Sequence, residues 1–552
     1  MGIIDKLLKK EKTDVVEEIG VKTKLPDINF EKVDEYYINE PYSKINIFKS
    51  KDLSEELYYY SIEDPLNDTE NDTYEKLMKI MSKELEPPTE EGISPRKYVL
   101  EQAENLVKKY ERSLGKYDET TWNKIYYYVV RDLAGYGPLD AIMHDGEIED
   151  ISCNGVDAPL YVWHRKYESI PTNLMFTNGQ TLNDFIVKLA HKSTKHISSA
   201  QPLLDGMLPE KHRLAATFMK EVSTKGSTFT IRKFREVPLS VIDLIKIGTL
   251  NERIAAYFWM ILEYKMSFMI LGGTGAGKTS LLNAILSLMS GNDKIVTCEE
   301  VPELRPPVSN WTQLNTRQSF QVGNEASKNI TLFDLIKVSL RYRPDYLVVG
   351  EVRGEESYTL FQALATGHGG LCTMHADSLD SAVKRLTSPP MNVAEVYIPL
   401  MNSALHVQRV KLPNKDGGIK FGRRVRTIWE IEEFGKYKEI VKWDPSTDSF
   451  NTKLENSLLL RKIAQTSGMP LEAIIQELEL RELYIKNMVD TGLHDQTEVT
   501  SRILNYHCNA GDKICDNDEM KKDNNTTIEK ENIYNEVDKI DLVPVHSMKN
   551  SR

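Results

Sequence analysis

The 552-residue sequence has few cysteines, and their spacing fits neither a set of disulfide bonds nor a metal site. Its five cysteines are scattered, and none of them belongs to a C-x-x-C pair. A disulfide framework needs an even, regularly spaced set, and a tetracysteine zinc site needs two such pairs. The sequence therefore predicts a protein of a reducing compartment that has neither feature.

Long apolar runs are also missing. A membrane-spanning helix needs about 18 consecutive apolar residues, and the nearest candidate, residues 257–271, is interrupted by Glu263 and Lys265. The first ten residues lack the apolar stretch of a secretory signal. We expect a cytoplasmic protein without a membrane span. Residues 1–12 nevertheless have the spacing of a short basic amphipathic helix, so peripheral association with the inner face of the cell membrane is an alternative to a frayed terminus.

Positive charge is not in surplus. Lys+Arg 70 against Asp+Glu 82 gives a net charge of −12, whereas general nucleic-acid binders need surplus Lys and Arg to neutralise phosphates. The sequence also lacks a concentrated basic stretch interleaved with aromatic residues. We expect no nucleic-acid partner, although a local basic groove stays open.

Apolar periodicity divides the chain into six segments. Alternating strand-like and helical runs in the fourth segment predict a parallel sheet of βαβ units, hence an α/β fold preceded by a mixed α/β domain. The front of the chain is acidic and rich in tyrosine, and it is interpreted as a loosely built region. The segments are a variable N-terminal region (1–92), an N-terminal α/β domain (93–238), a helical connector (239–266), the βαβ core (267–390), a β-rich and helical extension (391–508) and a disordered tail (509–552).

Residues 272–279 read GGTGAGKT and match the phosphate-loop motif G-x-x-x-x-G-K-[ST]. An apolar strand-like run precedes the motif and a helical run follows it, which is the context that the motif requires. The glycines let backbone N–H groups surround a polyphosphate. Lys278 is expected on the β- and γ-phosphates, and the Thr279 hydroxyl on Mg²⁺. The predicted nucleotide-binding residues here are Gly272, Gly273, Thr274, Gly275, Ala276, Gly277, Lys278, Thr279 and Ser280.

Three further apolar runs end in candidate catalytic side chains. Ligands bind beyond the carboxyl ends of parallel strands, so these side chains are expected near the phosphate loop. Glu351 is predicted to organise the metal, and His375 to contact the γ-phosphate. Any of Glu299, Glu300 and Glu303 is suited to preparing a water for attack, while Glu299 and Glu300 fit equally well as simple caps of a strand end.

Four segments, in this order, resemble the Walker A, Asp box, Walker B and His box of the type II/type IV secretion ATPases. They are residues 272–279, 295–304 (IVTCEEVPEL), 340–354 (LRYRPDYLVVGEVRG) and 366–378 (TGHGGLCTMHADS). Residues 202–213 (PLLDGMLPEKHR) and 231–234 (IRKF) are similar to the N-terminal domain of that family. The resemblance covers about residues 94–490 and is nearest the archaeal pilus and archaellum branch. One departure is Glu299-Glu300 where Glu-Asp is common, which leaves the role of Glu300 open.

The resemblance implies a RecA-like P-loop ATPase that uses ATP and Mg²⁺, forms a homohexamer and works with an integral-membrane platform protein. It makes Glu303 the water-activating carboxylate, places Glu351 and Thr279 on the metal side, and makes His375 a γ-phosphate sensor. By position it also adds five arginines without assigning which act across a subunit boundary. These are Arg341 and Arg353 as catalytic residues, and Arg213, Arg232 and Arg317 as nucleotide-binding residues.

The function implied is a cytoplasmic ATP hydrolase that powers assembly or secretion of pilin-like subunits. A hexameric nucleic-acid translocating ATPase is the alternative, and the net charge of −12 disfavours it. A nucleotide-dependent scaffold with negligible turnover is a third possibility, which the set of Glu303, Glu351 and His375 disfavours.

Overall fold

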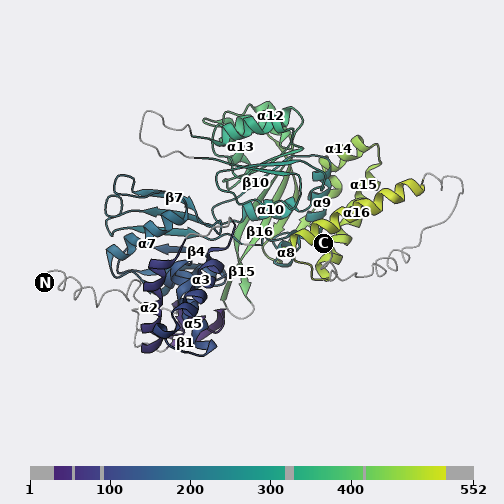
Figure 1. Cartoon of the computed structure of the whole chain (residues 1–552). Helices are drawn as coiled ribbons and strands as arrows, with labels where there is room; N and C mark the ends of the chain where they lie inside the picture. The colour runs from purple at the N-terminus through teal and green to yellow at the C-terminus, as the bar shows by residue number, and fades with distance from the viewer. Residues whose placement is uncertain are drawn as a thin grey trace. The chain divides into compact units, whose positions relative to one another are not determined.

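The computed structural model describes residues 30–51, 56–86, 92–235, 237–317, 329–414 and 418–517. The chain divides into two compact units, Met1–Val237 and Pro238–Arg552, and each is described by itself (Figure 1). The predicted amphipathic helix at residues 1–12 lies outside the described residues.

The first unit is built on a nine-stranded sheet with the order β1-β2-β3-β6-β5-β4-β9-β8-β7. Neighbouring strands are antiparallel except β3 and β6, which pair in parallel at Tyr59 and Thr172. The Asn173 side chain reinforces this junction with two 2.9 Å hydrogen bonds to the backbone of Ser61. The strands are β1 (Phe30–Asn39), β2 (Ser43–Ser50), β3 (Leu57–Glu63), β4 (Ile148–Cys153), β5 (Pro159–His164), β6 (Glu168–Met175), β7 (Leu203–Met207), β8 (Arg213–Thr217) and β9 (Thr228–Arg232).

Helices of the first unit form two groups. One packs against the sheet and shares its apolar core, and the other buries leucine, valine and methionine side chains in a small helical cluster of its own. The first group is η1 (Gly137–Leu139), α6 (Asp140–His144) and α7 (Gly179–Lys192), and the second is α2 (Asp68–Glu84), α3 (Pro95–Lys109), α4 (Glu111–Leu114) and α5 (Glu119–Leu133).

The structure does not place a boundary at residue 92. Strands β1–β3 belong to the same sheet as β4–β9, and Ile45, Ile47 and Tyr59 are fully buried in its core. The tyrosine-rich runs that suggested a loose region are strands, because aromatic and β-branched side chains suit a half-buried pleated surface. The Tyr59 hydroxyl also donates to the buried carboxylate of Asp145 at 2.8 Å, which ties the hairpin to the rest of the unit.

The second unit is built on another nine-stranded sheet, with the order β12-β11-β13-β14-β10-β15-β16-β17-β18. The first six strands in this order are parallel, and the last three continue the sheet antiparallel. The strands are β10 (Phe268–Leu271), β11 (Ile295–Glu299), β12 (Trp311–Asn315), β13 (Tyr346–Val349), β14 (Gly369–Met374), β15 (Ser403–Asn414), β16 (Gly418–Glu433), β17 (Lys436–Asp444) and β18 (Ser449–Thr452).

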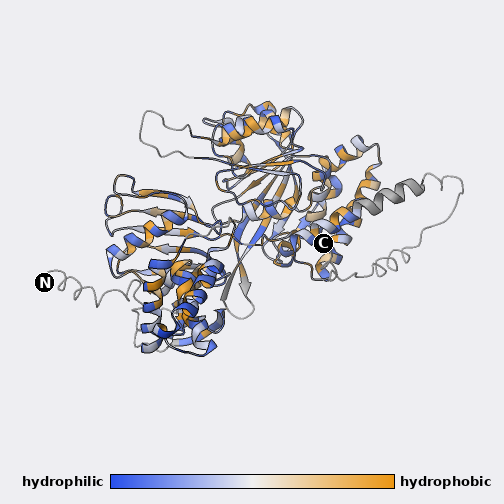
Figure 2. Cartoon of the chain, in the orientation of Figure 1, coloured by the Kyte–Doolittle hydropathy of each residue, from blue (hydrophilic) through white to orange (hydrophobic). Residues whose placement is uncertain are grey.

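Helices cover both faces of this sheet, and the strand pattern shows why. In β10 the side chains of Phe268 and Ile270 join the core on one face, while those of Met269 and Leu271 join the core on the other. Successive side chains of a strand point to opposite faces, so a strand that is apolar throughout must be covered twice. Figure 2 shows these central strands coloured mostly hydrophobic. The predicted α/β fold class is confirmed.

Two sets of helices provide this cover (Figure 1). One face carries α11 (Leu332–Ser339), α12 (Glu356–Ala365), α13 (Leu379–Thr387) and η3 (Glu395–Leu400), with η2 (Leu340–Tyr342) following α11. The other face carries α8 (Val241–Lys246), α9 (Glu252–Glu263), α10 (Lys278–Leu286), α14 (Leu458–Ser467), α15 (Leu471–Asp490) and α16 (Gln496–Asn517), with η4 (Leu454–Asn456) before α14.

Helix α16 runs past the predicted start of the disordered tail at residue 509 and is assigned to Asn517, so that boundary falls inside a helix. Residues 518–552 lie outside the described residues. Within the described part of the chain, no helix is both long enough and apolar enough to cross a membrane.

Candidate nucleotide-binding site

The phosphate loop connects the carboxyl end of β10 to the start of α10, as the sequence predicts. Gly275 and Gly277 adopt left-handed backbone conformations with φ of 68° and 89°, which favour glycine. Gly272 is needed for another reason, since a Cβ there would lie 2.5 Å from the carbonyl oxygen of Val407 in β15. The motif's glycines therefore allow both the turn of the loop and the close approach of a neighbouring strand.

Lys278 is the first residue of α10 and lies half-buried at the loop. Its Nζ donates to the carbonyl oxygen of Gly273 at 3.0 Å. Burial lowers the pKa of this ammonium group, and the nearby carboxylates of Glu351 and Glu303 act in the opposite direction. Both carboxylates therefore lie within electrostatic reach of Lys278. A bound triphosphate would balance the charge of Lys278, and a divalent cation would balance the carboxylates.

His375 joins the site from β14, the strand beside β10. Leu271 and Met374, the last residues of the two strands, are paired in parallel register, so both strands end at the same edge of the sheet. The His375 Nε2 lies 3.1 Å from the Thr274 hydroxyl oxygen of the phosphate loop. The structure thus brings this histidine to the loop, in a place where it could respond to the γ-phosphate.

Glu351 follows β13 and is held by an arginine. Arg353 donates from Nη2 to Glu351 Oε2 at 2.5 Å and from Nη1 to Glu300 Oε2 at 3.3 Å. Two neighbouring strand ends, those of β11 and β13, are therefore linked through one guanidinium. Glu300 is exposed and has this positioning contact with Arg353, whereas Glu351 lies nearer the phosphate loop and influences Lys278.

Glu299 is a buried positioning residue. Its Oε1 accepts hydrogen bonds from the backbone N–H groups of Glu303 and Leu304, both at 2.9 Å, and its Oε2 accepts one from Gln313 at 3.0 Å. Burial raises its pKa to about 7, although these hydrogen bonds act to lower it. Because Glu299 fixes the backbone at Glu303, the half-exposed Glu303 is the acid of the three that remains suited to acting on a water.

The five predicted arginines lie in different places. Arg213 and Arg232 are cross-strand partners in the first unit, where they pair with Asp205 at 2.9 Å and Asp150 at 3.2 Å. Arg353, in contrast, lies at the site and contacts the carboxylates of Glu351 and Glu300.

Arg341 and Arg317 are not brought to the phosphate loop. Arg341 lies in η2, before β13 begins, and so at the amino end of the parallel strands, opposite the edge that carries the site. Arg317 follows the edge strand β12, which three strands separate from β10. Within this unit, the expected contribution of Arg341 to catalysis is therefore not supported by its position.

Basic residues of the β15–β16 hairpin lie next to the phosphate loop, and the sequence analysis did not identify them. Arg423 donates from Nε to the carbonyl oxygen of Gly275 at 3.3 Å, and its Cδ would lie 3.0 Å from a Cβ on Gly277. Arg409 and Arg426 line a hollow of about 370 Å³ beside Gly273 and Thr274. The signal was the arginine-rich run at residues 423–426, but its relevance depends on the order of strands in the sheet.

Magnesium fits this donor set. Among the described residues, no three His, Cys, Asp or Glu side chains gather closely enough to hold a metal by themselves. Mg²⁺ commonly binds through one or two protein oxygens together with substrate phosphates. The Thr279 hydroxyl and the second carboxylate oxygen of Glu351 are hard oxygen donors of that kind.

Comparison with known proteins identifies the family of the chain. Residues 160–410 match the family model described as "Type II/IV secretion system protein". Protein MJ0900 of Methanocaldococcus jannaschii is 38% identical over 397 residues, which cover 70% of each chain. A "Putative conjugal transfer protein" of Mycobacterium tuberculosis is 32% identical over 255 residues, 45% of this chain and 70% of that protein. The chain belongs to the type II/IV secretion system ATPase family.

Membership of the secretion ATPase family confirms the resemblance predicted from the four motifs, together with the RecA-like fold and its preceding α/β unit. A solved structure of the pilus retraction motor PilT with bound ADP is 17% identical, with 64% of this chain and 93% of that chain covered and a TM-score of 0.36.

Proposed function

We propose that this secretion ATPase hydrolyses ATP with Mg²⁺ at the phosphate loop, and that as a homohexamer it drives assembly or secretion of pilin-like subunits through an integral-membrane platform protein. The observation that carries the proposal is the convergence of Glu351, His375 and Glu303 on the loop that holds Lys278. A scaffold that only binds nucleotide does not need a carboxylate held for water activation.

Each side chain has a distinct role in this proposal. Lys278 binds the β- and γ-phosphates, and Thr279 and Glu351 hold Mg²⁺, which neutralises charge on the phosphates when bound. Glu303 accepts a proton from the attacking water, while Glu299 keeps the Glu303 backbone in position. His375, through its contact with Thr274, reports whether a γ-phosphate is present.

The test of catalysis uses three single variants of the full chain. Lys278→Ala should abolish ATP hydrolysis because the phosphates lose their main cation. Glu303→Gln should lower kcat by about 100-fold or more while ATP binding is kept, since general-base catalysis contributes about this factor. Glu355→Gln is the matched control, because Glu355 is exposed after the same strand as Glu351 and should leave kcat unchanged. Normal turnover of the Lys278→Ala variant would contradict the proposal.

Oligomeric state and partner need separate tests. We expect the purified chain to form hexamers when ATP is bound, as measured by mass photometry with the Glu303→Gln variant, which should hold ATP without turnover. Co-purification from the source cell should recover an integral-membrane protein, because the secretion role requires a membrane partner. A monomeric chain under these conditions would remove the hexamer from the proposal.

A second candidate function, translocation of nucleic acid, is favoured by one structural observation. The β15–β16 hairpin places the Arg409 guanidinium 4.4 Å and the Lys411 ammonium 5.9 Å from the ring centroid of the exposed Phe421. Cations around an exposed aromatic ring are the elements of a single-strand binding surface. Stimulation of ATP hydrolysis by single-stranded DNA, lost in Phe421→Ala, would favour this candidate over the first.

A further inference from the structure

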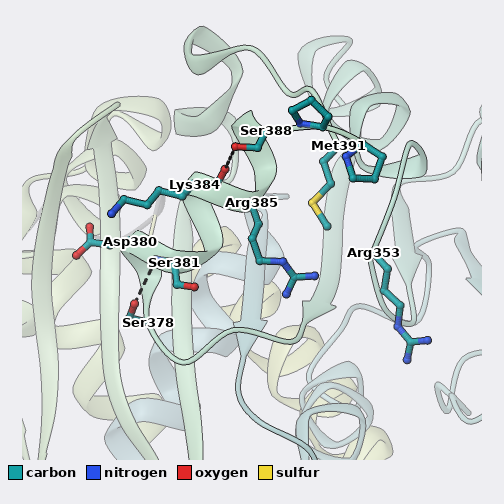
Figure 3. A pocket seen from close by; sticks show the side chains of 10 residues that line it. Arg353, Ser378, Asp380, Ser381, Lys384, Arg385, Ser388 and Met391 are labelled. Atoms are coloured by element: carbon teal, nitrogen blue, oxygen red, sulfur yellow. Dashed lines mark hydrogen bonds between the residues drawn. The ribbon is translucent and has the colours of Figure 1, made fainter.

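A hollow of about 460 Å³ lies between the loop after β13 and helix α13 (Figure 3). Its polar lining consists of Arg353 from the loop, and Ser378, Asp380, Ser381, Lys384, Arg385 and Ser388 from α13 and its ends, which makes three cations against one carboxylate. Guanidinium and hydroxyl groups are hydrogen-bond donors that suit an oxyanion. The composition of the lining therefore points to a small anionic ligand.

Arg385 is a cation held in place by a backbone carbonyl. Its Nη1 donates to the backbone carbonyl oxygen of His375, which fixes the guanidinium beside the His375 loop. Within the described residues, no carboxylate lies within ion-pair distance of Arg385. Its remaining N–H groups are available for a ligand, and because they are already positioned, little side-chain freedom would be lost on binding.

Two contact paths connect this hollow to the phosphate loop. The first runs from Arg385 to the carbonyl of His375, whose ring contacts Thr274. The second runs from Arg353 to Glu351, which lies within electrostatic reach of Lys278. The hollow is thus next to the residues that face the γ-phosphate in the proposed function.

The Arg385 side chain points in a different direction from the other charged side chains of α13, Lys384 and Asp380 (Figure 3). Figure 3 shows Arg385 extending from α13 toward the side where Arg353 lies, whereas Lys384 and Asp380 point the other way. The two guanidinium groups therefore dominate the charge that a ligand in the hollow would meet. Lys384 carries the same charge on the same helix and offers a matched comparison.

We propose that this hollow is a binding site for inorganic phosphate, through which the product of ATP hydrolysis leaves the catalytic site. Hydrolysis transfers the γ-phosphoryl group from ATP to water, with ADP as the leaving group, and yields ADP, phosphate and a proton. Arg385 takes two phosphate oxygens in a bidentate pair, as guanidinium groups do, and the hydroxyls of Ser378 and Ser381 donate to the others. The role as an exit site rests on the proposed function, whereas binding of phosphate does not.

The first experiment measures phosphate binding without turnover. The full-length Lys278→Ala chain, in which the phosphate loop has lost its main cation, is titrated with inorganic phosphate at constant ionic strength and followed by calorimetry. We expect saturable binding that Lys278→Ala/Arg385→Gln weakens about tenfold and Lys278→Ala/Lys384→Gln leaves within about twofold. Loss of all binding in Lys278→Ala, or equal weakening by Arg385→Gln and Lys384→Gln, would overturn the site.

The second experiment follows product release in the chain with an intact phosphate loop. A fluorescent phosphate sensor reports release, and acid quenching reports bond cleavage, in a single turnover. Arg385→Gln should slow release relative to cleavage, while Lys384→Gln should behave as the unsubstituted chain does. Unchanged release in Arg385→Gln would overturn the exit role. If the unsubstituted chain does not cleave ATP, the proposed function fails, and the titration still decides whether the hollow binds phosphate.

Discussion

At the scale of single residues, the site depends on side chains that hold the backbone of other residues. Glu299 holds Glu303, Arg385 holds His375, and Arg423 holds the phosphate loop at Gly275. Glu299 contacts Glu303 within a single motif, four residues away, whereas Arg423 reaches Gly275 from a strand that is distant in the sequence. Substitutions at these positions should change how precisely the site residues are positioned, and they remove no reacting group.

Arg423→Ala should weaken ATP binding by about fivefold, because one loop hydrogen bond is worth about 1 kcal/mol. The Arg423 side chain also covers Gly277, so the loop would gain freedom that binding must remove. Equilibrium titration with a fluorescent ATP analogue measures the effect. Arg461→Ala, an exposed arginine on α14, is the control and should bind as the unsubstituted chain does. Equal affinity in all three proteins would argue against a role for Arg423.

Glu299 makes stability depend on pH in a defined direction. Its pKa is raised from 4.5 to about 7 by burial, so over this interval the folded chain holds a proton that the unfolded chain releases. Stability therefore falls as the pH rises from about 4.5 to about 7, by at most about 3 kcal/mol from this group.

Glu299→Gln removes this titration. The free energy of unfolding of the variant, relative to the unsubstituted chain, should rise between about pH 5 and about pH 7 and then level off. Urea denaturation of both proteins across that range measures the difference. Altered hydrogen bonding to Gln313 adds an offset that does not vary with pH. A difference that stays constant with pH would show that Glu299 does not titrate there.

At the scale of elements, a buried carboxylate joins the antiparallel strands of the second sheet to helices that pack on one of its faces. Glu430 of β16 is fully buried. It accepts hydrogen bonds from the Tyr257 hydroxyl of α9 at 2.8 Å, from the Ser457 hydroxyl, and from the backbone N–H of Leu458 at 2.5 Å. This side chain therefore connects β16, the strand that also carries Arg423, with helix α9 and the start of helix α14.

Glu430→Ala should destabilise the chain by about 3 kcal/mol or more, because it leaves two buried hydroxyls and one partly buried backbone N–H without their acceptor. The change is measured as a lower urea midpoint for the unfolding of the second unit. Glu432→Ala, two residues along the same strand and exposed, should change stability by less than about 0.5 kcal/mol. If the two variants were equally stable, the connection through Glu430 would be unimportant.

At the scale of the whole chain, residues before the predicted boundary at 92 are part of a folded unit. Removal of residues 1–92 deletes β1, β2, β3 and α2. It exposes the backbone edge of β6 and removes Leu77 and Met81 from the helical cluster. An uncovered strand edge is a template for aggregation, so deletion of residues 1–92 should damage the first unit.

We predict that the chain lacking residues 1–92 is insoluble or fails to fold its first unit, whereas the chain lacking residues 1–29 stays folded, because that deletion removes no described element. Soluble yield and a thermal melt of both truncations decide between them. A well-folded product of the longer deletion would show that β4–β9 form an independent domain. Partner-binding experiments should therefore use the shorter truncation.

Much of the site could be predicted from the sequence because its parts are local. The phosphate loop needs glycines, Lys278 and Thr279 within eight residues, and each strand end carries its own acid or histidine. Apolar runs also determined the parallel sheet, because a strand apolar on both faces must be covered by helices on both. These features depend on neighbouring residues and on the period of the pattern.

Only the tertiary structure decided which distant residues meet. Arg423 follows Gly275 by 423 − 275 = 148 residues and reaches it because β15 and β16 continue the sheet from β10. Arg341 lies in a motif yet falls at the far edge of the sheet, since it precedes β13. Glu299 is buried and Glu300 is exposed. The sequence does not reveal this difference, because the two residues are identical and adjacent. The sequence by itself determined the chemistry at each strand end, whereas long-range strand order and burial decided which side chains share a site, because those are properties of packing rather than of local pattern.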